Sequence, residues 1–213
     1  VRDVYNTIIP NAKKGAILID MTTSSPSLAK ELYNEAKSND LNMLDAPVTG
    51  GDLGAINASL SIMVGGDKDV FESVLPLLEK LGTTINYMGR AGSGQDAKLA
   101  NQIAIAGAIG GAAEALSYAK AKELNLNNML AVITGGSASS WQAVNNGPKM
   151  IERDFKPGFF LKHLLKDLNL AIEEKGQQHL PLLESIQKIY DQLEQNGLGD
   201  EGSQAIIKYY EDK

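Results

Sequence analysis

The hydrophobic pattern divides the chain into two parts with different periodicity. In the first part, short apolar runs predict strands over 16–20, 42–46, 60–64 and 83–88. Apolar residues at helical spacing predict helices over 1–9, 25–37 and 67–80, between and before these strands. Strands that alternate with helices are typical of an α/β sheet with helices on its faces.

From residue 93 onward every pattern is helical. The spacing predicts helices over 93–124, 126–134, 140–153, 159–175, 182–195 and 203–210. The first of these is rich in alanine and glycine and carries no charge over 103–113. Small residues let other helices approach closely, so this long helix is expected at the centre of an all-α domain. We therefore predict an α/β domain over 1–91 followed by a helical domain over 92–213.

Composition excludes several classes of function. The net charge of -6 argues against a nucleic-acid or anionic-membrane partner. The chain has no cysteine and two histidines, which argues against a metal site. No secretory signal is evident, and the apolar stretch 99–113 is too short and too rich in glycine to span a bilayer. These features favour a soluble, cytoplasmic enzyme or binding module.

A glycine-rich turn at 92–94 opens the long helix and places a lysine one turn further on. Lys98, Asn101 and Gln102 share one face of that helix, because residues three and four apart are neighbours. In a polar pocket, burial would bring the lysine into a range useful for proton transfer. The alternative is a lysine that extends to solvent, with amides that cap the helix start.

Polar or glycine-rich turns follow three of the predicted strands, over 20–26, 45–51 and 64–66. In open α/β sheets, ligands bind at the carboxyl ends of the strands. No G-x-G-x-x-G follows an early strand, and the glycines over 89–94 have the wrong spacing for a phosphate loop. The chain also begins inside a helical pattern, so the α/β part looks incomplete.

Four motifs, in matching order, resemble those of the β-hydroxyacid dehydrogenases, which include 3-hydroxyisobutyrate dehydrogenase and tartronate semialdehyde (2-hydroxy-3-oxopropionate) reductase. Residues 20–26 resemble D-x-S-T-x-x-P and residues 45–51 resemble D-A-P-V-S-G-G. Residues 92–101 resemble G-x-G-x-x-x-K-x-x-N, and residues 166–168 match K-D-L. The stretch 139–159 is also similar to the family.

The resemblance implies a fold and a reaction. The fold is the later part of a Rossmann-like dinucleotide-binding domain, followed by a helical domain like the C-terminal domain of 6-phosphogluconate dehydrogenase. The reaction is hydride transfer between NAD or NADP and a small carboxylate-bearing substrate, a β-hydroxyacid or its semialdehyde. A homodimer or higher homo-oligomer is expected through the helical domain.

The resemblance also implies roles for individual residues. Lys98 is the general acid/base, and Asn101 or Gln102 holds the lysine or the substrate hydroxyl. The substrate carboxylate is bound by Thr49, Gly50 and Gly51. The nicotinamide side of the cofactor is contacted by Thr23 and Lys166, and Asp167 orients that lysine. His163 and His179 are expected to be structural or exposed, and Trp141 to pack or to form a pocket wall.

The sequence departs from the family pattern at three places. Thr49 stands where serine is usual, which keeps the hydroxyl, and Gln102 follows Asn101 where some relatives have two asparagines. The amino-terminal dinucleotide fingerprint is absent from these residues. We therefore expect a fragment or processed form of a longer enzyme, inactive and weak in dinucleotide binding by itself.

A non-catalytic remnant that retains the helical oligomerisation domain is the alternative. A remnant has no need of Lys98, Lys166 and the Thr49–Gly51 motif together, so their presence disfavours it. A G-x-G-x-x-G in the upstream coding sequence would distinguish the enzyme from the remnant.

Overall fold

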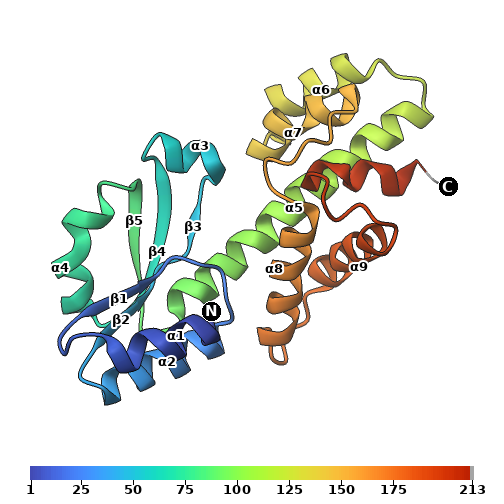
Figure 1. The fold of residues 1–213 in the computed structure, drawn as a ribbon. Helices are drawn as coiled ribbons and strands as arrows, with labels where there is room; N and C mark the ends of the chain where they lie inside the picture. Colours follow the sequence, from blue (N-terminus) through green and yellow to red (C-terminus); the bar gives the residue numbers. More distant parts are fainter. Residues whose placement is uncertain (212–213) are drawn as a thin grey trace. The chain divides into compact units, whose positions relative to one another are not determined.

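The computed structural model describes residues 1–211, and its contacts divide the chain into two compact units (Figure 1). The first unit comprises Val1–Ala100 and the second Asn101–Lys213. The long helix α5 (Ser93–Ala121) belongs to both, because the division falls within it.

The first unit is an α/β structure, as predicted. Its helices are α1 (Arg2–Asn11), α2 (Pro26–Ser38), α3 (Gly51–Ile56) and α4 (Lys68–Leu78). Its strands are β1 (Ile17–Asp20), β2 (Asn42–Asp45), β3 (Val48–Thr49), β4 (Leu60–Gly66) and β5 (Gly82–Gly89). The four predicted strands correspond to β1, β2, β4 and β5, whereas β3 and α3 were not predicted.

The sheet is mixed, with the order β1-β2-β4-β3 and with β5 paired to β4. β1 runs parallel to β2, and β4 runs parallel to β5, but β2 and β3 are antiparallel to β4. Asp45 in β2 pairs with Gly65, and Thr49 in β3 pairs with Ser61. The glycine turn that ends β4 therefore lies beside β2 and away from Thr49. Of the three turns predicted to follow strands, those after β2 and β4 meet here, because Gly65 pairs with Asp45 at the end of β2.

Helices cover both faces of the sheet (Figure 1). Residues of α4 pack with Leu44 and with β4 in one hydrophobic cluster. Residues of α1 and α2 pack with Met43 in another. Met43 and Leu44 are consecutive in β2, and consecutive side chains of a strand point to opposite faces, so the two clusters lie on opposite sides of the sheet.

The second unit is helical, also as predicted. Besides the rest of α5, it contains α6 (Leu126–Gly135), α7 (Trp141–Glu152), α8 (Leu161–Glu174), α9 (Pro181–Gln195) and the 3₁₀ helix η1 (Ser203–Tyr210). α5 lies between the pair α6–α7 and the pair α8–α9 (Figure 1). A Cβ at Gly110 would lie 3.0 Å from a side-chain carbon of Ile186, so this glycine permits the close approach of α9.

The length of α5 bears on the expectation that the apolar stretch 99–113 is too short to span a bilayer. The whole helix has 29 residues and, by length and composition alone, is long and apolar enough to cross a membrane. Of its most apolar window, 44% is buried inside the protein. Core helices of soluble proteins meet the same criterion, so the finding is weak evidence for a membrane span.

Candidate active site

The turn between β1 and α2 is built from hydroxyl side chains. Asp20, buried at the end of β1, accepts hydrogen bonds through Oδ1 from the Thr22 N–H at 2.9 Å and the Thr22 hydroxyl at 2.7 Å. Ser25 caps α2 by accepting from the Leu28 N–H at 3.0 Å, and Pro26 is the first helical residue. Half-buried Thr23 lies between these two local motifs.

A buried carboxylate holds the start of α5 against the sheet. Asp45, at the end of β2, is 2% exposed. Its Oδ1 accepts from the Gly92 N–H at 2.8 Å, and its Oδ2 accepts from the Gln95 N–H at 2.9 Å. Burial raises the pKa of Asp45, while the backbone N–H donors act in the opposite direction. An anion at a helix N-terminus is also favoured by the helix dipole.

The glycines around this contact are required by packing. A Cβ on Gly94 would lie 2.5 Å from the Met63 carbonyl oxygen and 2.6 Å from the Asp45 carbonyl oxygen. A Cβ on Gly65 would lie 2.6 Å from Asp45 Oδ1 and 2.8 Å from the Gly94 nitrogen. The glycine-rich turn thus lets the backbone of α5 touch the backbone of two strands.

Gln95 joins the β1–α2 turn to α5, and the sequence reasoning missed it. Its side chain is fully buried, accepts from the Ser24 N–H at 3.1 Å through Oε1, and donates from Nε2 to the Thr22 carbonyl at 2.8 Å. Both bonds flank Thr23. The one available signal was the position of Gln95 three residues before Lys98, which places both on one helix face.

Lys98 lies one turn into α5 and is 6% exposed. Its side chain is therefore buried, and it does not extend along the helix into solvent. A buried charged group is stable only with polar partners, so the surroundings of this side chain must be polar.

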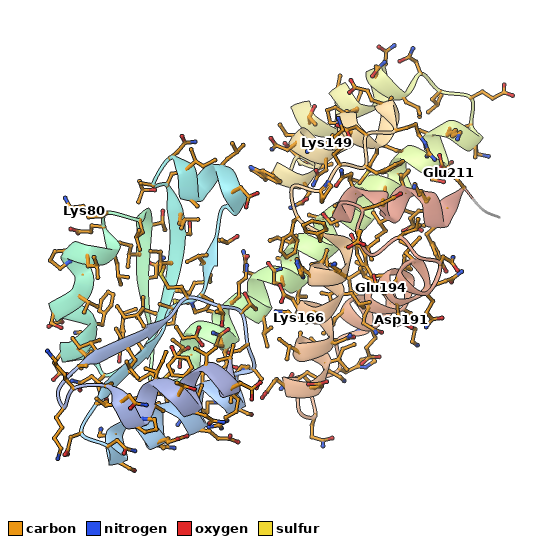
Figure 2. All side chains as sticks on the ribbon, in the orientation of Figure 1. Lys80, Lys149, Lys166, Asp191, Glu194 and Glu211 are labelled. Atoms are coloured by element: carbon orange, nitrogen blue, oxygen red, sulfur yellow. The ribbon has the colours of Figure 1, made fainter. Side chains whose placement is uncertain are left out.

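The two amides that follow Lys98 have different surroundings. Gln102 Nε2 donates to Asp167 Oδ2 on α8 at 2.7 Å, and both residues are buried. Lys166 lies on α8 (Figure 2). Its side chain is half exposed and forms an ion pair with Asp167, with 3.0 Å between Nζ and Oδ1. Asn101 Oδ1 is buried with no hydrogen-bond partner among residues 1–211. Gln102 is thus already engaged between helices, whereas Asn101 keeps an open acceptor.

The Thr49–Gly51 motif forms the connection between β3 and α3. Gly50 and Gly51 have φ values of 135° and 62°, a region that favours glycine. Thr49 ends β3 and Gly51 begins α3, whose first backbone N–H groups have no partner within the helix.

The remaining candidates lie on the surface. His163 and His179 are exposed, and Trp141 is 66% exposed. Trp141 therefore does not pack in the core of the described chain, and its alternative role as a pocket wall stays a prediction. Among residues 1–211, no group of three or more histidine, aspartate or glutamate side chains could hold a metal ion.

A cavity of about 530 Å³ opens in the first unit, apart from the predicted site residues. It is lined by Lys30, Tyr33, Asn34, Gly66, Asp67, Lys68, Tyr87, Arg90 and Ala91. Tyr33 and Tyr87 are fixed by hydrogen bonds to Asp67 and to the Gly66 carbonyl. None of the residues assigned to the reaction lines this cavity.

Two protein-family models match the chain. The model of the NAD binding domain of 6-phosphogluconate dehydrogenase covers residues 1–89. The model described as NAD-binding of NADP-dependent 3-hydroxyisobutyrate dehydrogenase covers residues 92–210.

Individual proteins are similar over nearly the whole chain. An uncharacterized oxidoreductase of Bacillus subtilis is 47% identical over 99% of this chain and 75% of its own length. The 2-hydroxy-3-oxopropionate reductase of Escherichia coli is 38% identical over 93% of this chain and 68% of its own. The structure of Mycobacterium tuberculosis 3-hydroxyisobutyrate dehydrogenase with L-serine has a TM-score of 0.89, at 32% identity, over 97% of this chain and 74% of that one.

Proposed function

Because the chain belongs to the 3-hydroxyisobutyrate dehydrogenase family of NAD(P)-dependent oxidoreductases, we propose that the protein interconverts a small β-hydroxyacid and its semialdehyde. The observation that carries this proposal is the burial of Lys98 on a helix whose start is bonded to the sheet. The names of the relatives support the substrate class, since L-serine is itself a β-hydroxyacid.

The residues of the β1–α2 turn suit a dinucleotide. The turn follows the carboxyl end of β1, which is parallel to β2, and such ends are where α/β sheets bind ligands. The Ser24 hydroxyl is buried with no hydrogen-bond partner among the described residues. Thr23 and Lys166 would hold the cofactor on its nicotinamide side, and Asp167 would orient Lys166. When bound, NAD or NADP accepts or supplies the hydride.

Lys98 would move the proton of the substrate oxygen. Oxidation of the alcohol releases this proton to the lysine, and reduction of the semialdehyde takes a proton from it. Such general acid–base catalysis contributes about 10²–10⁴-fold to the rate.

Asn101 is the better candidate of the two amides for the substrate hydroxyl or the lysine. Its Oδ1 has no hydrogen-bond partner within residues 1–211, whereas Gln102 is held by Asp167. A buried acceptor without a partner is costly, and a substrate hydroxyl or an ammonium group would remove that cost.

Thr49, Gly50 and Gly51 would bind the substrate carboxylate. The threonine hydroxyl supplies one donor, and the backbone N–H groups supply the others. Both residues have positive φ values, which glycine adopts without strain.

The decisive experiment replaces Lys98 in the full-length protein. A panel of small β-hydroxyacids and semialdehydes with both cofactors first identifies the best pair. Lys98→Ala should then lower kcat by about 10²-fold or more, while the Kd for NAD(P)H, followed by fluorescence, changes little. Lys122→Ala is the matched control, because Lys122 is exposed and follows α5. A Lys98→Ala rate within about threefold of the unmodified protein excludes the acid/base role.

A further inference from the structure

We propose that Gln95 is a positioning residue that holds the cofactor-side turn and the catalytic lysine in one rigid arrangement. The inference rests on the proposed function, because it takes the roles of Thr23 and Lys98 from there. It concerns a residue that makes no contact with substrate in the proposed mechanism and acts through its neighbours.

The side chain of Gln95 clamps the backbone on both sides of Thr23. It donates to the carbonyl of Thr22 and accepts from the N–H of Ser24, from 73 and 71 residues away in the sequence. One amide group thus pairs with the turn as a neighbouring strand would, through one donor and one acceptor. A local contact also fixes this turn, from the Thr22 N–H and hydroxyl to Asp20 Oδ1. Gln95 therefore sets where Thr23 stands relative to α5.

The helix side of the junction is equally constrained. The backbone N–H of Gln95 donates to Asp45 Oδ2, which ties the same residue to β2. Lys98 follows three residues later on the same helix face. Any displacement of Thr23 relative to Lys98 must therefore break buried hydrogen bonds. Hydride transfer requires close placement of cofactor and proton donor, and a misplacement of about 1 Å can slow a reaction about 10²-fold.

A second buried glutamine in the chain allows a matched comparison. Gln204 is 1% exposed, and its Nε2 donates to the carbonyls of Asp154 and Lys156, both at 3.0 Å. It therefore makes the same kind of contact as Gln95, two hydrogen bonds from a buried amide to distant backbone. None of its partners is a proposed site residue, so its loss should affect stability alone.

The test compares Gln95→Met with Gln204→Met in the full-length protein. Both variants should lower Tm, because each leaves buried backbone groups unpaired. Only Gln95→Met should raise the Kd for NAD(P)H about fivefold. It should also lower kcat about tenfold or more and increase the primary isotope effect with cofactor deuterated at C4, since hydride transfer becomes slower. Gln204→Met should leave all three quantities within about twofold.

A double-mutant cycle tests whether Gln95 acts through Thr23. With Thr23→Val in place, the further change Gln95→Met should raise the Kd much less than it does alone, because the Thr23 hydroxyl that the Gln95 bonds position is already gone. Additive effects would overturn the proposed route.

Two further outcomes decide the proposal. If folded Gln95→Met keeps its Kd, kcat and isotope effect within about twofold of the unmodified protein, Gln95 is structural only. If Gln95→Met does not fold, Gln95→Glu replaces it: this variant keeps the acceptor for Ser24 but, when ionised, turns a carboxylate oxygen toward the Thr22 carbonyl, so it should shift the same three quantities in the same direction. Unchanged values would overturn the proposal. The Kd for NAD(P)H can be measured without turnover. The role of Gln95 can therefore be refuted or supported independently of the acid/base role of Lys98.

Discussion

Substituting alanine for Gly94 tests the contact between α5 and the sheet. Its Cβ would lie 2.5 Å from the Met63 carbonyl oxygen, 2.6 Å from the Asp45 carbonyl oxygen and 2.8 Å from Asp45 Oδ2. Two of these oxygens belong to strand backbone, which cannot rotate away as a side chain can. The helix start must therefore move, which weakens the bonds from Gly92 and Gln95 to the Asp45 carboxylate.

The expected change in the free energy of unfolding follows from three contributions. Overpacking costs about 1–3 kcal/mol. Each weakened bond to a charged group contributes up to about 1.5–3 kcal/mol. Alanine gains about 1 kcal/mol over glycine in helix propensity. We expect Gly94→Ala to lower the free energy of unfolding by about 2–4 kcal/mol, measured by urea unfolding and circular dichroism.

Gly111→Ala on the same helix is the control, for which we expect a change of opposite sign in the free energy of unfolding. No heavy atom lies within 4 Å of a Cβ built at Gly111, and the residue is exposed. The same substitution should there raise the free energy of unfolding by about 0.5–1 kcal/mol. If the free energy of unfolding of Gly94→Ala lies within about 0.5 kcal/mol of that of the unmodified protein, the close contact of Gly94 with the strand backbone is wrong.

Two other predictions concern the substrate and the pH. Thr49→Ala should raise KM for the hydroxyacid about tenfold, the equivalent of one charge-assisted hydrogen bond, and Thr49→Ser should leave it nearly unchanged; an unchanged KM in the alanine variant would place the carboxylate elsewhere. Burial raises the pKa of Asp45 above its unfolded value of about 3.9, so the folded protein binds the proton of this carboxyl more tightly than the unfolded chain does. The resulting stabilisation is fully present below the unfolded pKa and is lost as pH rises through the folded pKa. Urea unfolding from about pH 4 to 7 should therefore show a decline that Asp45→Asn lacks, and parallel curves would contradict the raised pKa.

Most of the secondary structure follows from local pattern. The strands β1, β2, β4 and β5 and the helices of both units lie where apolar periodicity predicts them, within a few residues at their ends. The pattern failed for β3 and α3, because two residues and six residues are too short to show a period. It also predicted helix without its type over 203–210, where the structure has a 3₁₀ helix.

The sequence by itself determined the alternation of elements, the helix face shared by Lys98, Asn101 and Gln102, and the motifs that match the family. Tertiary structure alone decided which residues from distant parts of the chain meet. Asp45 meets Gly92 across 47 residues, Gln102 meets Asp167 across 65, and Gln95 meets Ser24 across 71. Periodicity reports only which face of one element is buried, whereas such contacts depend on how strands pair and helices pack. The antiparallel course of β4, which local pattern does not encode, is what brings Gly65 beside Asp45 and allows the start of α5 to rest on the sheet.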